Sequence, residues 1–131
     1  MNTLTIDIRK AEPRDADAIA DVHQEAWRGA YSGIIPHRAL TTMINRRGAD
    51  WWANAIRRAA TVLVVEIGGR IAGYATIGKN RARELKQQGE IYELYMRPEY
   101  QGIGLGSRLF KAARSRLADH GLKGNQSALS F

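Results

Sequence analysis

The 131-residue sequence contains no cysteine, which excludes a disulfide scaffold, a thiol nucleophile and a cysteine-ligated metal. No apolar run approaches the roughly 18 residues that a membrane span needs. The first residues also lack the basic and then apolar layout of a secretion signal. The three histidines, His23, His37 and His120, have no partner at the spacing of a metal site. We therefore expect a cytoplasmic protein that binds neither a membrane nor a metal.

The chain does contain enough apolar sequence for one hydrophobic core. Hydrophobic residues make up 44% and aromatic residues 8% of the sequence, and a chain of this size buries about two-thirds of its unfolded surface. We expect residues 1–131 to form a single domain. The net charge of +7 attracts polyanions, but it does not distinguish nucleic acid, acidic membrane and phosphorylated cofactor. The basic residues form no known nucleic-acid motif, so specific nucleic-acid binding is not expected.

Apolar periodicity predicts an α+β fold. Runs typical of strands lie at residues 4–9, 61–67, 70–77 and 90–96. Stripes with spacings of three and four predict helices over 13–31, over most of 36–60 with a break at 46–48, and over 104–120. The order of these elements favours a mixed, largely antiparallel sheet flanked by helices. Residues 123–131 are mostly small and polar and continue no helical pattern.

The most informative segment follows the last predicted strand. Glycines at 102, 104 and 106 permit a sharp turn into the next helix, whose free N–H groups and positive dipole end favour an anion such as a pyrophosphate. Arg108 and Lys111 add positive charge on the first turns. The same glycines are also compatible with a turn that has no ligand. Their spacing differs from that of a P-loop and from that of a dinucleotide-binding fingerprint.

The segment resembles the acetyl-CoA-binding motif of the GNAT acetyltransferase superfamily, Arg/Gln-x-x-Gly-x-Gly/Ala. The motif positions, with the residue that follows, are Gln101, Gly102, Ile103, Gly104, Leu105, Gly106 and Ser107. The order of the preceding strands and helices is similar to that of the family over residues 4–122. The resemblance implies a GNAT-like fold and an N-acetyltransferase that uses acetyl-CoA and moves the acetyl group to a primary amine of a small molecule or peptide.

The resemblance also implies which residues hold the cofactor. The main-chain amides of the motif would surround the pyrophosphate, and the strand residues Leu94, Tyr95 and Met96 would pair with the pantetheine arm. The amide near Leu94 would meet the thioester carbonyl and stabilise the negative charge that develops there.

A base must remove a proton from the amine, and Glu90 and Glu93 are the candidates. They are an odd number of residues apart, so a regular strand directs them to opposite faces unless a bulge intervenes. We prefer Glu90, although each is equally typical of a solvated carboxylate. His23 lies on an apolar helix face, as core histidines do, and Trp27 and Tyr31 follow it toward the expected acceptor site.

The sequence departs from the family after the last predicted helix. Family members usually continue with another strand, a helix carrying a tyrosine that protonates the leaving thiolate, and a hairpin. We find no such pattern, so no general acid is assigned and the fold is expected to be C-terminally incomplete. An open sheet edge promotes association, which predicts a homo-oligomer. The alternatives are a truncated, non-catalytic domain that binds coenzyme A and, from the charge alone, a nucleic-acid-binding protein.

Overall fold

The computed structural model describes residues 5–58, 60–79 and 89–119. Its sheet has the strand order β1-β2-β3-β4, and every neighbouring pair is antiparallel. The strands are β1 (Ile6–Lys10), β2 (Thr61–Ile67), β3 (Arg70–Lys79) and β4 (Gly89–Met96). The helices are α1 (Ala16–Tyr31), α2 (His37–Asn45), α3 (Ala49–Arg57) and α4 (Leu105–Asp119), with 3₁₀ turns at Pro13–Asp15 and Pro98–Tyr100.

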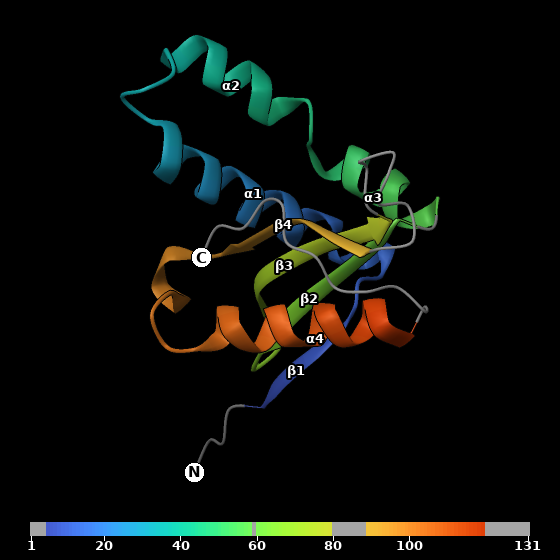
Figure 1. The fold of residues 1–131 in the computed structure, drawn as a ribbon. Helices are drawn as coiled ribbons and strands as arrows, with labels where there is room; N and C mark the ends of the chain where they lie inside the picture. Colours follow the sequence, from blue (N-terminus) through green and yellow to red (C-terminus); the bar gives the residue numbers. More distant parts are fainter. Residues whose placement is uncertain (1–4, 59, 80–88, 120–131) are drawn as a thin grey trace.

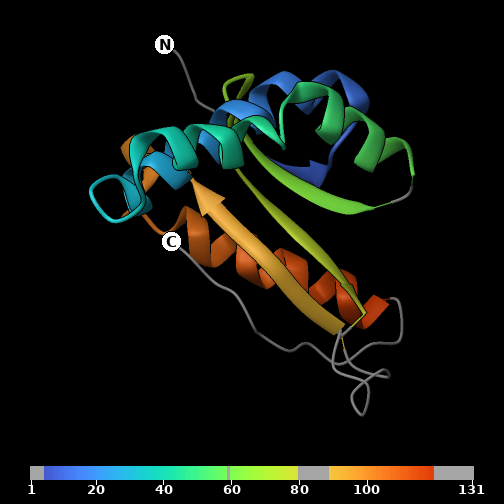
Figure 2. The same cartoon turned by 90° about the horizontal axis from the view of Figure 1, so that it is seen from above.

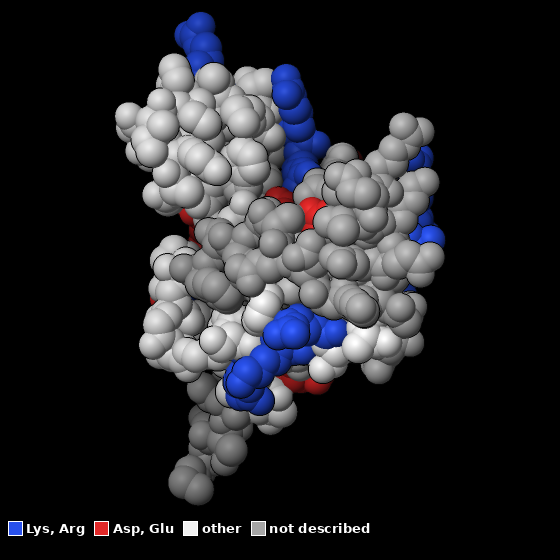
Figure 3. Space-filling model, in the orientation of Figure 1, with Lys and Arg blue, Asp and Glu red and all other residues white. Residues whose placement is uncertain are grey.

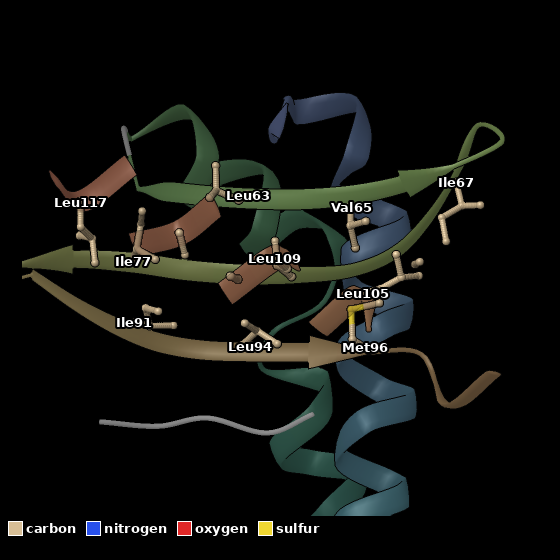
Figure 4. Close-up of a cluster of buried hydrophobic side chains, with 13 residues drawn as sticks. Leu63, Val65, Ile67, Ile77, Ile91, Leu94, Met96, Leu105, Leu109 and Leu117 are labelled. Carbon is tan, nitrogen blue, oxygen red and sulfur yellow. The ribbon is translucent and has the colours of Figure 1, made fainter. Parts of the chain in front are cut away.

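Helices cover both faces of the sheet (Figure 1). On one face α4 packs its residues at spacings of four against β2, β3 and β4, as its sequence predicts. Figure 4 shows this core, in which Leu105 lies near Met96, Leu109 near Leu94 and Leu117 near Ile77. On the other face α1 and α3 pack against β2 and β3 (Figure 2), and Trp52 is fully buried there.

A network of charged side chains fixes β1 against the start of α1. The Arg9 guanidinium donates to both carboxylate oxygens of Asp15, at 2.8 and 2.9 Å, and to Glu66 on β2 at 2.8 Å. The Asp15 carboxylate also accepts from the Glu12 amide at 2.7 Å. Hydrogen bonds from Arg9 lower the pKa of Asp15 despite its burial, so this carboxylate keeps its charge at neutral pH.

The sequence predicts these elements closely. The β2–β3 hairpin turns through Gly68 and Gly69, whose φ angles are 55° and 85°, values that favour glycine. The predicted break at 46–48 separates α2 from α3. Residues 80–88, His120, Gly121 and the tail at 123–131 lie outside the described residues.

Candidate active site

The glycine-rich turn presents a run of main-chain amides without partners. Gly102 and Gly104 have φ angles of 80° and 86°, and a Cβ atom at either would meet nothing within 4 Å. The first helical bond of α4 runs from the Arg108 amide to the Gly104 carbonyl at 3.2 Å. Among the described residues, no group accepts a hydrogen bond from the amides of residues 102–107. This is the arrangement that binds an anion at a helix N-terminus.

The main chain of β4 beside this turn has groups that face away from β3. The Arg97 amide donates to the Ala72 carbonyl at 2.8 Å, and alternate residues of an antiparallel strand direct their polar groups to the same neighbour. The N–H and C=O groups of Leu94 and Met96 therefore face the opposite side. The Gln101 side chain confirms this for Met96, because its amide nitrogen donates to the Met96 carbonyl at 3.1 Å.

Arg97 fixes the position at which β4 enters the glycine-rich turn. Its side chain is only 7% exposed. Nε donates to the Ile71 carbonyl at 2.8 Å and Nη1 donates to Glu25 on α1 at 2.9 Å. Because Arg97 links β3, β4 and α1 next to the Pro98–Tyr100 turn, the loop starts from a rigid base. The sequence reasoning missed this role, since a buried arginine before a proline follows no periodic pattern.

A β-bulge in β4 places both candidate bases on one face of the sheet. Thr76 pairs with Glu93 but Ile77 pairs with Ile91, so Tyr92 is an extra residue in β4. Ile91 and Leu94 both enter the core under α4. Glu90 and Glu93 consequently share the other face, because the bulge that the prediction named as its exception is present. The extra residue reverses the side-chain alternation between them.

The two carboxylates differ in their surroundings. Glu90 is 3% exposed. The Glu93 side chain is 16% exposed and forms an ion pair with Arg47, whose Nη1 donates to Oε1 at 2.7 Å. Arg47 belongs to the short connection between α2 and α3, and its side chain is 35% exposed. Its guanidinium carbon lies 4.6 Å from the centroid of the Trp51 ring, a cation–π arrangement.

Aromatic rings surround this ion pair. We call His23, Trp27, Tyr31, Trp51, Trp52, Tyr74 and Tyr95 the aromatic cluster. Ring centroids are 5.2 Å apart for His23 and Trp27 and for Trp27 and Tyr31, and 5.0 Å apart for Trp51 and Trp52. Tyr74 lies 4.9 Å from Trp52 and 5.7 Å from Tyr95. The cluster therefore extends from α1 and α3 to β4.

Burial determines the protonation state of the cluster's titratable groups. Desolvation, with a smaller contribution from the nearby Arg47 charge, lowers the pKa of His23 to about 4, so this imidazole is neutral at pH 7. Burial and the Glu93 charge raise the pKa values of Tyr74 and Tyr95, so both phenols keep their protons. His23 is 1% exposed, in agreement with its prediction as a core residue.

Among the described residues, the buried polar atoms without a hydrogen-bond partner include two in the aromatic cluster and one on β3 beside Glu93. They are Trp27 Nε1, Trp52 Nε1 and Thr76 Oγ1. Thr76 is the residue that pairs with Glu93 across the sheet. Buried polar groups without partners are uncommon and costly, and these three lie among the same residues as the Arg47–Glu93 pair.

The charged residues outside the aromatic cluster include a group of basic side chains on α4. Basic side chains gather on the surface over α4 (Figure 3). The exposed basic residues of α4 include Arg108, Lys111 and Arg114. Within residues 5–58, 60–79 and 89–119, no three histidine or acidic side chains are arranged to hold a metal ion. The helices described there include none that is long and apolar enough to cross a membrane.

Comparison with known proteins shows the family to which the chain belongs. The family model described as "Acetyltransferase (GNAT) family" matches residues 17–130. The chain belongs to the GNAT family. It is 30% identical over 116 residues to YuaI, an uncharacterized N-acetyltransferase of Bacillus subtilis, in an alignment that covers 88% of this chain and 66% of YuaI. This GNAT chain thus spans slightly less than two-thirds of the length of that relative.

Two further matches, both to N-acetyltransferases of Thermoplasma acidophilum, cover most of this chain. A spermidine N(1)-acetyltransferase is 25% identical over 120 residues, which is 91% of this chain and 74% of that protein. The crystal structure of the PaiA N-acetyltransferase, in complex with coenzyme A, has a TM-score of 0.78 at 22% identity. The match covers 90% of this chain and 75% of that one. The predicted family and fold class are therefore confirmed.

The structure brings the predicted GNAT site residues into one region. Residues 101–107 form the turn and the first residues of α4, and Leu94, Tyr95 and Met96 end the adjoining strand. Trp27 and Tyr31 belong to the aromatic cluster beside Glu93. Sequence reasoning did not find Arg47, which lies 46 positions from its partner Glu93, because an isolated arginine between two helices gives no signal.

Proposed function

We propose that this chain binds acetyl-CoA and transfers its acetyl group to a primary amine. The observation that carries the proposal is the set of amides at residues 102–107, which have no partner among the described residues, next to the side of β4 that faces away from β3. A diphosphate satisfies the amides at the turn, and Arg108 and Lys111 add charge of the right sign. The similarity to PaiA, whose crystal structure contains coenzyme A, supports this choice of anion. The main-chain groups of β4 that face away from β3 suit a pantetheine arm.

The Leu94 amide then acts on the thioester. When the amine nitrogen attacks the carbonyl carbon, negative charge develops on the carbonyl oxygen, and an N–H fixed in the main chain stabilises it. Donors of this kind contribute about 3–4 kcal/mol to transition-state stability in measured cases. The C–N bond forms, the C–S bond breaks, and the sulfur leaves as a thiolate that takes up a proton. Alignment of the two reactants contributes much of the remaining acceleration.

Glu93 is the better placed of the two candidate bases. An amine with a pKa near that of lysine, about 10.4, arrives as an ammonium ion and must lose a proton before it attacks. Glu93 immediately precedes Leu94 and shares its face with the aromatic cluster, whereas Glu90 lies three residues farther from Leu94. We therefore assign the proton transfer to Glu93, directly or through water, instead of to Glu90.

The acceptor is a primary amine in this proposal. The similarity to a spermidine acetyltransferase supports an aliphatic amine. Trp27 and Tyr31, as members of the aromatic cluster, are the candidates for contact with it.

An acetyl-transfer assay tests the function. Free thiol released from acetyl-CoA is measured with and without a panel of primary amines, and amine-dependent release is expected. Binding of coenzyme A is measured separately by thermal shift. Binding without amine-dependent release would instead favour the non-catalytic coenzyme A-binding domain, and no binding would refute both readings.

A further inference from the structure

The Arg47–Glu93 ion pair joins two residues of unequal burial. Glu93 is 16% exposed and faces aromatic rings, while Arg47 is 35% exposed and stacks on Trp51, which is itself 41% exposed. If the pair opens, the guanidinium reaches solvent by rotation of its own side chain. The Glu93 carboxylate cannot reach solvent in the same way, because its main chain is held in a strand. Without a counter-ion this buried charge would destabilise the folded state.

The surroundings of Glu93 are those of a cation-binding site. Electron-rich faces of Trp and Tyr attract a cation, and the rings of Trp51, Tyr74 and Tyr95 all lie near the carboxylate or its partner. The unpartnered Thr76 Oγ1 lies directly across the sheet from Glu93 and can accept a hydrogen bond from an ammonium group. Arg47 supplies the cation in this structure, and its place suits any cation of similar size.

We propose that Arg47 is an internal substitute for the acceptor, and that an ammonium group of the acceptor displaces it from Glu93. The acceptor class is then a cationic amine, whose charge replaces that of the guanidinium. This inference rests on the proposed function, because it takes Glu93 as the group that meets the amine. It adds that Arg47 competes with the acceptor, so that removal of Arg47 strengthens amine binding instead of weakening it.

The test measures amine binding directly, without turnover. The change in intrinsic fluorescence of Trp27, Trp51 and Trp52 is titrated with 1,4-diaminobutane, n-butylamine or lysine in the presence of coenzyme A, which has no acetyl group to transfer. The protein, Arg47→Met, Arg47→Lys and Arg14→Ala are compared. Arg14 is the matched control, because it forms an ion pair with Glu12 in which both side chains are exposed.

We expect Arg47→Met to lower the Kd for the amines about tenfold, while Arg47→Lys and Arg14→Ala change it less than twofold. Comparison of the three amines shows which kind of molecule carries the ammonium group that binds best. 1,4-Diaminobutane carries a second cation, lysine also carries a carboxylate, and n-butylamine carries no other charge. 1-Butanol, which has no charge, is expected to produce no saturable change in any variant. A Kd that rises in Arg47→Met, or that stays within twofold of the original, would overturn the proposal.

A double variant separates this outcome from general effects on the fold. In a Glu93→Gln background, Arg47→Met is expected to leave the amine Kd unchanged, because the competition acts through the carboxylate. A tenfold gain that persists without the Glu93 charge would overturn the mechanism. Thermal shift with coenzyme A on the same samples reports the proposed function separately. Loss of that shift would refute cofactor binding, whereas the amine titrations alone decide the role of Arg47.

Discussion

Gly104 and Gly69 provide a matched pair that tests whether the glycine-rich turn holds the cofactor. Their φ angles are 86° and 85°, and a Cβ atom at either meets no heavy atom within 4 Å. Gly104 precedes α4, whereas Gly69 turns the β2–β3 hairpin. Gly104→Val and Gly69→Val therefore impose similar strain, about 1–2 kcal/mol for a left-handed residue with a side chain, but at different places.

The expected difference lies in the response to coenzyme A. A ligand present at 100 times its Kd stabilises the folded state by about 2.7 kcal/mol, which raises the melting temperature of a chain this size by roughly 10 °C. We expect the original chain and Gly69→Val to show this rise and Gly104→Val to lose most of it. The valine side chain projects where the phosphate approaches the amides of residues 102–107.

The assay is a thermal-shift titration with coenzyme A, with chemical denaturation to confirm that the two valine variants lose similar stability. Equal shifts in all three proteins would refute the reasoning, since the cofactor would then bind without the turn. Loss of the shift in Gly69→Val alone would place the ligand at the hairpin, which is equally incompatible with the proposed site.

Other predictions concern burial and association. The pKa of about 4 for His23 lies below its unfolded value of about 6.5, so its contribution to stability is present above pH 6.5 and is lost as pH falls toward 4. The unfolding free energy should fall by about 3 kcal/mol more in the original chain than in His23→Gln over that interval, as urea titrations at several pH values will show. Arg97→Met should cost about 2–4 kcal/mol in urea unfolding, because it leaves the Ile71 carbonyl and Glu25 without their donor; a cost below about 0.5 kcal/mol would contradict the anchoring role. A Cβ at Gly73 would lie 2.5 Å from the Tyr95 carbonyl oxygen, so Gly73→Ala should lower the unfolding free energy by about 2 kcal/mol, measured against the original chain by urea titration. We also predict a homo-oligomer, and sedimentation that shows only monomer at micromolar concentration would count against it.

The sequence predicted local features well because they depend on neighbours along the chain. The hairpin at Gly68 and Gly69 and the α4 stripe each follow from residues a few positions apart. The faces of Glu90 and Glu93 were not predictable in the same way. A bulge depends on how β4 meets β3, and Tyr92 does not differ in type from residues of a regular strand.

Ion pairs between residues far apart in the sequence could not be predicted from its periodicity. Arg47 contacts Glu93 only because α2 and α3, which it connects, both pack against α1. Arg97 contacts Glu25 across 72 positions. A single sequence contains no periodicity that links such residues. The predicted position of Trp27 and Tyr31 next to the reactive strand came from the family resemblance, not from spacing.

The extra residue in β4 lets one short segment present different chemistry in three directions. Ile91 and Leu94 point down into the hydrocarbon layer beneath α4, the two glutamates point up, and the peptide groups of Leu94 and Met96 point sideways in the plane of the sheet. An insertion or deletion of one residue between 90 and 94 would turn charged side chains toward the hydrophobic core and apolar side chains away from it along half the strand. Substitutions here are therefore far safer for an engineer than insertions or deletions.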